Sequence, residues 1–124
     1  SWVEMLLEEG HNIVADGPEG LVGHAVYTPV EAAQPELAVF VHPAFHDRGI
    51  GTELCKRIAA AAADAGREAL ELHVERHNRA AIAVYRRIGF EVVDDDHSIQ
   101  MVLPLDEAVT ASVRTPRAEQ SPKA

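Results

Sequence analysis

The segment from His46 to Gly51, His-Asp-Arg-Gly-Ile-Gly, has the residue types and spacing to bind a phosphate group. It stands between an apolar stretch, Glu36 to Val41, and a helical pattern that follows it. The first backbone N–H groups of a helix have no partner within the helix, and the helix dipole adds partial positive charge there. Gly49 and Gly51 have no Cβ atoms, so phosphate oxygens can approach the backbone closely, and Arg48 can add charge. These six residues are equally compatible with an ordinary strand-to-helix turn.

The two commonest nucleotide-binding loops are excluded at this turn. No Gly-Lys-Ser or Gly-Lys-Thr follows the glycines, so the turn is not a Walker loop. Leu54 stands where the dinucleotide fingerprint requires a third glycine. The turn therefore indicates phosphate binding without either of these signatures.

A second stretch, Asn78 to Phe90, places two polar side chains on one face of a predicted helix. Asn78 and Tyr85 are seven residues apart, about two helical turns. Asn78 is also a favoured N-cap residue, whatever its function. Tyr85 lies in line with Ala81 and Ile88, so packing in the core is the alternative to a chemical role. A tyrosine hydroxyl in such a position could protonate a leaving group.

A local excess of positive charge accompanies this stretch. Residues 76–90 contain no acidic residue, in a chain with a formal net charge of -9. Their basic residues are Arg76, Arg79, Arg86 and Arg87. Such a cluster suits a polyanionic ligand, and a solvated helix face is the alternative.

The elements that must position these residues follow from hydrophobic periodicity and from the placement of Gly and Pro. The pattern predicts helices at Trp2–Glu9, Thr52–Ala65 and Asn78–Ile88. It predicts strands at Asn12–Ala15, Leu21–Val30, Glu36–Val41, Ala69–Glu75, Phe90–Val93 and Ile99–Leu105. The third strand is almost wholly apolar from Leu37 on, which predicts burial on both faces. The fold class is therefore α/β, or α+β by some conventions, with a mixed, mainly antiparallel twisted sheet, a central parallel strand pair and flanking helices.

Taken together, the two motifs resemble those of the GNAT superfamily of N-acetyltransferases. Val41 to Leu54 is similar to the family's main coenzyme A motif, a strand ending in Val-x-Pro followed by Gln/Arg-x-x-Gly-x-Gly/Ala at the start of a helix. Asn78 to Phe90 is similar to the second motif, an Asn, a Tyr seven residues later, and then Gly-Phe. The resemblance covers roughly residues 12–105. His46 stands where the family usually has Gln or Arg.

The resemblance implies acetyl-CoA as the cosubstrate. Six backbone amides would hold its diphosphate, those of Asp47, Arg48, Gly49, Ile50, Gly51 and Thr52. Three strand residues would pair with the pantetheine arm and polarise the thioester carbonyl, namely Val39, Phe40 and Val41. Asn78 would contact the cofactor arm, and Tyr85 would protonate the departing thiolate. The implied reaction is direct acetyl transfer to a neutral primary amine of a small molecule, a protein N-terminus or a lysine. A non-catalytic acyl-CoA-binding sensor or subunit is the alternative.

His73 is the predicted general base. In the branch of the family that acetylates protein N-terminal amines, a Glu occupies the matching position, and an imidazole can also accept a proton near neutral pH. The alternation of Ala69–Glu75 puts His73 on the polar face of its strand, together with Glu71 and Glu75. A satisfied surface or cleft histidine is the alternative, and the two glutamates are the other candidate bases.

We expect a single acetyltransferase-like domain over residues 1–105, with the cofactor-binding core at 36–90 and a disordered tail at 106–124. The family normally begins with a strand and two helices ahead of the first hairpin. Here only a remnant helix within residues 1–10 is predicted, so the usual first strand and helix are expected to be missing. A trimmed piece of a longer protein, a minimal variant and a homodimer completed by exchange are the three explanations.

Composition restricts the class of protein. The chain has 124 residues, with 20 Asp and Glu against 11 Lys and Arg, and one cysteine, Cys55. An acidic surface argues against a nucleic-acid-binding protein, and the lack of a long apolar run argues against a membrane protein. The single cysteine excludes an internal disulfide and favours the cytoplasm. The acidic, lysine-poor composition is typical of salt-adapted proteins, and it also suits cationic substrates. No spacing of His and Cys predicts a metal site.

Overall fold

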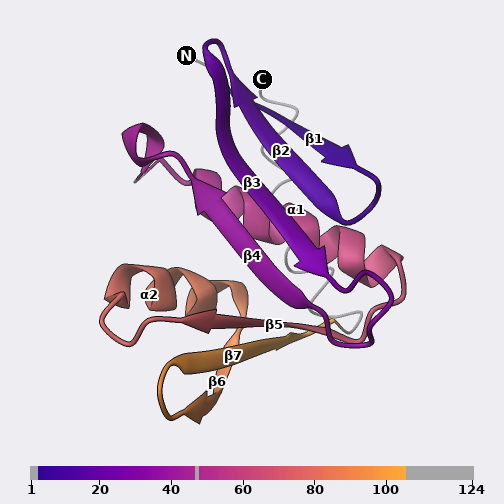
Figure 1. The fold of residues 1–124 in the computed structure, drawn as a ribbon, viewed down its shortest axis with the longest axis vertical. Coiled ribbons are helices and arrows are strands. Elements are labelled where there is room, and N and C mark those ends of the chain that lie inside the picture. Colours follow the sequence, from indigo (N-terminus) through magenta and orange to yellow (C-terminus); the bar gives the residue numbers. More distant parts are fainter. Residues whose placement is uncertain (1–2, 47, 106–124) are drawn as a thin grey trace.

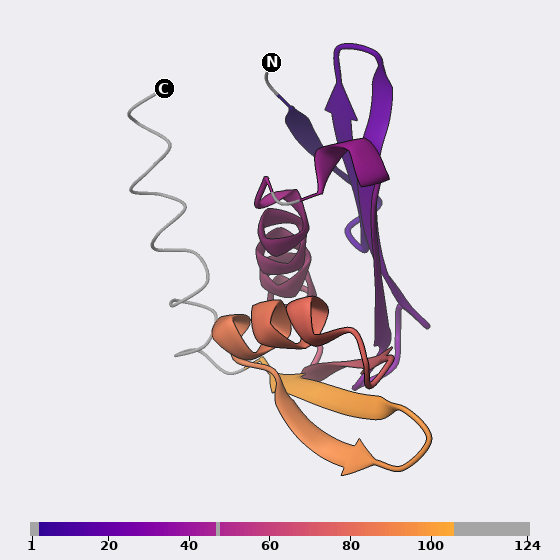
Figure 2. The same ribbon diagram turned by 90° about the vertical axis from the view of Figure 1, so that its left-hand side faces the viewer.

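The computed structural model describes residues 3–46 and 48–105, which form one seven-stranded sheet with two α-helices on one of its faces (Figure 1, Figure 2). The strand order is β1-β2-β3-β4-β5-β7-β6. The strands are β1 (Glu4–Glu8), β2 (Asn12–Gly17), β3 (Gly20–Thr28), β4 (Glu36–Val41), β5 (Ala69–Val74), β6 (Glu91–Asp95) and β7 (Ile99–Pro104). The helices are α1 (Ile50–Asp64) and α2 (Arg79–Ile88), and a short 3-10 helix, η1 (Pro43–Phe45), follows β4.

All neighbouring strands in this sheet are antiparallel except β4 and β5. The parallel pair is in register at Glu36 and Glu71, and its ladder is confined to that position. Beyond it the two strands diverge, as Figure 1 shows. The mixed sheet with a central parallel pair, predicted from the sequence, is confirmed, and so are both hairpins and both later helices.

The first element is a strand, so the helix predicted at Trp2–Glu9 is wrong. β1 pairs antiparallel with β2, with Glu4 opposite Asp16. A segment of this length cannot hold a helix by itself, because helix nucleation is costly. Its backbone bonds to β2 instead, and the alternation of side chains directs Met5 and Leu7 toward α1. The expected remnant helix is thus an edge strand of the sheet.

β4 is packed on one face only, so the predicted burial on both faces is wrong. Leu37 faces the core and is 4% exposed, whereas Phe40 is 52% exposed. Side chains alternate along a strand, and both helices lie on the face that Leu37 shares (Figure 2). In the part of the chain that the structure describes, no helix covers the opposite face. The apolar residues of β4 therefore lie on two different faces: one face is buried, and the other, which carries Ala38 and Phe40, is exposed.

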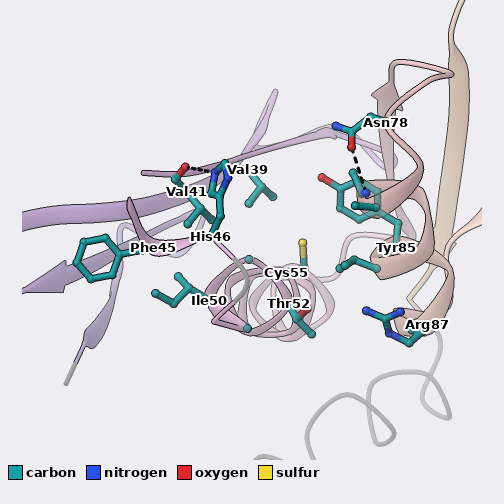
Figure 3. Close-up of a pocket in the computed structure, with 15 residues that line it drawn as sticks. Val39, Val41, Phe45, His46, Ile50, Thr52, Cys55, Asn78, Tyr85 and Arg87 are labelled. Carbon is teal, nitrogen blue, oxygen red and sulfur yellow. Dashed lines mark hydrogen bonds between the residues drawn. The ribbon is translucent and has the colours of Figure 1, made fainter. Parts of the chain in front are cut away.

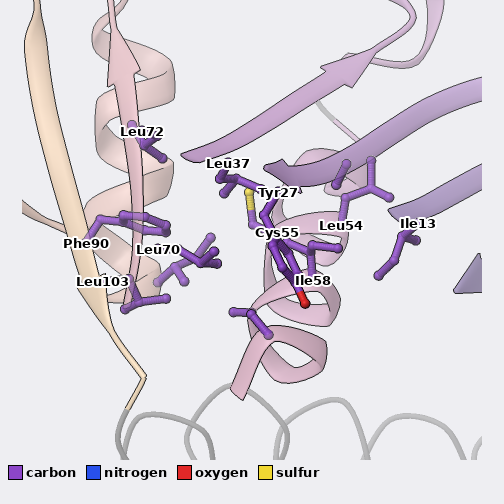
Figure 4. Close-up of a cluster of buried hydrophobic side chains, with 14 of the residues drawn as sticks. Ile13, Tyr27, Leu37, Leu54, Cys55, Ile58, Leu70, Leu72, Phe90 and Leu103 are labelled. Carbon is purple, nitrogen blue, oxygen red and sulfur yellow. The ribbon is translucent and has the colours of Figure 1, made fainter. Parts of the chain in front are cut away.

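α1 supplies much of the core between the helices and the sheet (Figure 4). Leu54 and Ile58 are fully buried on its inner side. Gly23 of β3 lies directly beneath Leu54, since a Cβ atom built at Gly23 would be 2.9 Å from Leu54 Cδ1 and 3.1 Å from the Phe40 carbonyl oxygen. The glycine thereby lets the first turns of α1 approach β3 and β4 closely.

The tail predicted at residues 106–124 lies outside the described residues. Neither described α-helix has the length and apolar character needed to span a membrane.

Candidate active site

An open pocket of about 570 Å³ lies between β4, the start of α1 and α2 (Figure 3). A volume of this size is typical of small-molecule sites. Eight of the residues predicted from the sequence line it, namely Val39, Val41, Gly49, Ile50, Gly51, Thr52, Asn78 and Tyr85. The two motifs, separate in sequence, therefore meet at one pocket.

The divergence of β4 and β5 leaves backbone groups of β4 facing the pocket. The Glu71 N–H donates to the Pro35 carbonyl on the β5 side, and the His42 N–H donates to the Val22 carbonyl on the β3 side. Because backbone groups of successive strand residues point to opposite sides, those of Val39 and Val41 point toward β5 and those of Phe40 point toward β3. β5 has already parted from β4 at this level. Val39 and Val41 therefore offer a strand edge to an extended ligand.

The start of α1 has the features of an anion site. Gly49 is its N-cap residue, with φ 78 and ψ 5, a left-handed conformation that glycine adopts without strain. Among the described residues no side chain caps the helix, which leaves its first amides available to a ligand. Glu53 is the acidic residue of the first turn, and it forms an ion pair with Arg57 at 2.8 Å. That pairing reduces the repulsion that an anion would meet at the helix start.

The loop between η1 and α1 is closed by His46, the residue that departs from the family pattern. His46 Nε2 donates to the Val41 carbonyl at 2.9 Å, so its side chain folds back onto β4. Arg48 stacks over the Phe45 ring at 5.2 Å and does not belong to the pocket lining. Asp47 lies outside the described residues. The hydrogen bond of the imidazole thus links the loop to the end of β4.

Asn78 caps α2 and lines the pocket, so the two interpretations of this residue are compatible. Its Oδ1 accepts from the Ala81 N–H at 3.2 Å, which satisfies one free donor of the helix start (Figure 3). The side-chain N–H groups are left to face the pocket, as hydrogen-bond donors to a carbonyl.

Tyr85 is half-buried on α2 and directs its hydroxyl into the gap between α2 and β4 (Figure 3). Its ring packs edge-on against Phe90, with centroids 5.6 Å apart. Burial, and secondarily the nearby Cys55, raise the pKa of the Tyr85 hydroxyl to about 12. Burial alone raises the pKa of the Cys55 thiol to about 12. Both groups are therefore neutral at physiological pH, and the hydroxyl holds a proton it can donate.

These two shifts predict that the folded chain loses stability in alkali. A group whose pKa is higher in the folded protein than in the unfolded chain stabilises the fold below the unfolded value, which is 9.0 for Cys55 and 10.0 for Tyr85. That stabilisation is lost as the pH rises through the folded value. We expect the free energy of unfolding to fall above pH 9, by up to about 1.4 kcal/mol per pH unit for each group. Urea titrations from pH 8 to 11 measure the slope, and Cys55→Ala should reduce it. An unchanged slope in that variant would contradict the assignment.

Two predicted site residues lie away from the pocket. The side chains of His73 and Phe40 are on the opposite face of the sheet. His73 Nδ1 is 3.3 Å from Glu36 Oε2 there. A base at this position would meet an acceptor that reaches the gap between β4 and β5 from that face.

Several lining residues were missed by the sequence analysis. Phe45, Val84 and Cys55 contribute apolar walls. Val84 stands three residues after Ala81, which also lines the pocket, so helical spacing could have identified it. Phe45 enters through the 3-10 turn, which no periodic pattern predicts. Of the arginine cluster, Arg87 lines the pocket, and Arg76 instead contacts Asp95.

Comparisons with known proteins agree with this geometry. A model of the acetyltransferase (GNAT) family matches residues 2–90. The uncharacterised N-acetyltransferase MJ1207 of Methanocaldococcus jannaschii is 45% identical over 53 residues, which are 43% of this chain and 24% of that protein. The L-amino acid N-acyltransferase MnaT of Escherichia coli is 26% identical over 98 residues, which are 74% of this chain and 57% of that protein.

Among solved structures, yncA from Salmonella typhimurium, determined with its cofactor acetyl-CoA, has a TM-score of 0.66 and 25% identity to this chain. That match covers 77% of this chain and 65% of the other. The matched part of the chain spans about a quarter and just over half of the length of the two curated relatives.

Proposed function

Because the chain belongs to the GNAT acetyltransferase family, we propose that it transfers an acetyl group from acetyl-CoA to a primary amine. The observation that carries the proposal is the pocket, which joins uncapped amides of α1, an unpaired edge of β4 and the hydroxyl of Tyr85. The three features match the diphosphate, the pantetheine arm and the thioester of one extended molecule. That yncA binds acetyl-CoA supports the same cosubstrate.

In the proposed binding mode the chain holds the cosubstrate along its whole length. Gly49, Ile50, Gly51 and Thr52, together with Arg48 and Asp47 of the preceding turn, hold the diphosphate. The N–H groups of Val39 and Val41 bind the arm, and one of them donates to the thioester oxygen as negative charge develops there. Phe40 makes no backbone bond to the arm, because its backbone groups bond to β3. It only continues the strand between Val39 and Val41. Asn78 donates to an amide carbonyl of the arm.

The chemical step needs one base and one acid. His73 removes a proton from the acceptor ammonium, and the neutral nitrogen attacks the carbonyl carbon. The new C–N bond forms as the C–S bond breaks, and the Tyr85 hydroxyl gives its proton to the departing sulfur. The second proton of the attacking nitrogen is lost to water, and Tyr85 regains its own proton from water. Tyr85 suits this role because burial keeps its pKa at about 12 and its hydroxyl protonated.

A non-catalytic acyl-CoA sensor or subunit is the alternative. The test is release of free thiol from acetyl-CoA in the presence of a broad panel of amines. Turnover with at least one amine supports the enzyme. Tight binding of acetyl-CoA by calorimetry without thiol release supports the sensor, and no binding at all refutes both.

The cation on the pocket wall gives a matched pair of variants. Both Arg86 and its neighbour Arg87 are exposed, but only Arg87 lines the pocket. Arg87→Gln is expected to raise the dissociation constant for coenzyme A by about tenfold, since a charge-assisted hydrogen bond at an exposed side chain contributes about 1.5 kcal/mol, the low end of its usual range. Arg86→Gln should have a much smaller effect. Calorimetry at low and moderate salt measures both dissociation constants. Equal losses of affinity would mean that only the total positive charge of α2 matters and not a contact of Arg87.

Two finer expectations belong to the same proposal. We keep the cytoplasm as the predicted location and a homodimer as a predicted assembly. The acceptor is expected to be a cation.

A further inference from the structure

The two faces of the sheet differ in charge. None of the seven strands carries a Lys or Arg. The basic residues of the described chain lie on α1, α2 and loops: Arg48, Lys56, Arg57, Arg67, Arg76, Arg79, Arg86 and Arg87. The strand registers put a set of acids on the face opposite the helices: Glu4, Glu8, Asp16, Glu36, Glu71, Glu91 and Asp94. The helix side therefore suits a polyanion, and the open face suits a cation.

Two of these acids lie side by side where β4 and β5 part. Glu36 and Glu71 are paired across these strands, and His73 follows on the same face of β5. One ligating atom from each of the three lies within 4.8 Å of the others. An ammonium group placed between the two carboxylates would contact both of them.

The negative charge of this cluster is not balanced by a basic side chain. Gln34 donates a neutral hydrogen bond to Glu71 at 2.8 Å. The ion pairs of the described residues give Glu36 only His73, and give Glu71 no Lys or Arg. Arg76, which follows β5, is held by Asp95. The site thus keeps two carboxylates for a cation that arrives from solution.

Next to the carboxylates the open face is apolar. Ala38 and Phe40 continue the same face of β4 beyond Glu36, and Phe40 is 52% exposed. A row of acid followed by apolar side chains complements a chain of methylene groups that ends in ammonium groups. The Phe40 ring adds a face on which a cation can rest.

We propose that the acceptor is an aliphatic di- or polyamine, bound on the open face with an ammonium group between Glu36 and Glu71. The inference rests on the proposed acetyl transfer and names its second substrate. The cosubstrate occupies the basic helix side, and the acceptor enters from the acidic side. The two meet at the gap between β4 and β5, where His73 takes the proton of the reacting nitrogen.

A small molecule fits better than a peptide. Peptides commonly bind a sheet by adding a strand to a free edge. The free edges here are β1 and β6, at the two ends of the sheet, and the part of β4 beyond Glu36 that the proposed cosubstrate takes. The cluster lies instead where β4 and β5 are paired. The cluster is also local, so it matches one ammonium group and not an extended basic segment.

The test compares acceptors of equal length and different charge. Putrescine, a four-carbon diamine, and n-pentylamine differ only in whether the far end carries an ammonium or a methyl group. We expect kcat/KM from thiol release to be about five- to tenfold higher for putrescine, and the difference to shrink as salt is raised. γ-Aminobutyrate, with an anionic end, should be poorest. No release with any amine refutes acetyl transfer itself. Thiol release with n-pentylamine, L-methionine or a lysine-containing peptide that equals or exceeds the release with putrescine is compatible with acetyl transfer but refutes a di- or polyamine as the acceptor.

Single substitutions test which carboxylates produce the preference for putrescine. Glu36→Gln and Glu71→Gln should each lower the ratio of putrescine to n-pentylamine activity by about two- to fivefold, and this ratio cancels effects common to both acceptors. Glu8→Gln removes one charge from the same face at the far end of the sheet and should leave the ratio unchanged. Equal effects of all three would mean that only net charge attracts the diamine. Stoichiometric binding of Zn²⁺ that Glu36→Gln abolishes, with turnover lost in EDTA, would instead make the cluster a metal site and overturn the proposal.

Discussion

Tyr85→Phe is expected to lower kcat by about 10²- to 10⁴-fold, the usual contribution of a general acid. The variant keeps the ring and its edge-on contact with Phe90, so the pocket wall is preserved. The dissociation constant for acetyl-CoA should therefore be nearly unchanged. Steady-state kinetics together with calorimetry separate the two quantities, and equal losses in both would make Tyr85 a packing residue.

The matched control for this change is Tyr27→Phe. Tyr27 is 2% exposed and donates a long hydrogen bond of 3.3 Å to the Gly10 carbonyl, away from the pocket. Loss of the same atom there should reduce stability slightly and leave kcat intact. The acid must be protonated to act, so Tyr85 should impose no fall in kcat until the pH approaches about 12.

Gly23→Ala is expected to destabilise the fold by about 1–3 kcal/mol, because the added methyl overpacks the contact between β3 and α1. The new Cβ would lie 2.9 Å from Leu54 Cδ1, and Leu54 is fully buried, so it cannot swing into solvent. A shift of roughly 4–8 °C in Tm for each kcal/mol follows from the size of the domain. Thermal and urea unfolding measure it.

A second substitution tests the contact directly. Leu54→Ala alone should cost about 2–5 kcal/mol through the cavity it leaves. In the double variant the new methyl at position 23 occupies part of that cavity. The double variant should therefore lose less stability than the sum of the losses of the two single variants. Strict additivity would show that the strain at Gly23 comes from the Phe40 carbonyl, 3.1 Å from the new Cβ. Gly51→Ala is the control, since its Cβ would meet only an ordinary contact at 3.5 Å.

Local signals explain what the sequence could predict. Gly49 and Asn78 each act at a helix start, Gly49 through its backbone conformation and Asn78 through its side-chain cap, and each can be recognised within a few residues of sequence. The later strands and both α-helices follow from apolar periodicity, with boundaries shifted by a residue or two. The meeting of the two motifs at one pocket was implied only by the resemblance.

Long-range pairing explains what the sequence could not predict. Met5 and Leu6 fit a helical spacing as well as a strand, and only the free edge of β2 decides in favour of a strand. Phe40 looks like a core residue until the sheet is seen to have one uncovered face. Glu36 and His73 are far apart in the chain and lie close together only because β4 and β5 pair in parallel. No periodic pattern in the sequence predicts that pairing.

That single pair has a mechanical consequence. β4 and β5 form the seam of the sheet, and beyond Glu36 and Glu71 the two halves are linked mainly through α1. Opening free energies of backbone amides are set by local cooperative units, so β5, β6 and β7 should open more readily than β2 and β3. A molecule that lies in the gap and bonds to β4 replaces the missing neighbour strand and joins the halves. The substrate then acts as a structural element of the sheet, and part of its binding energy is expressed as slower hydrogen exchange across the seam.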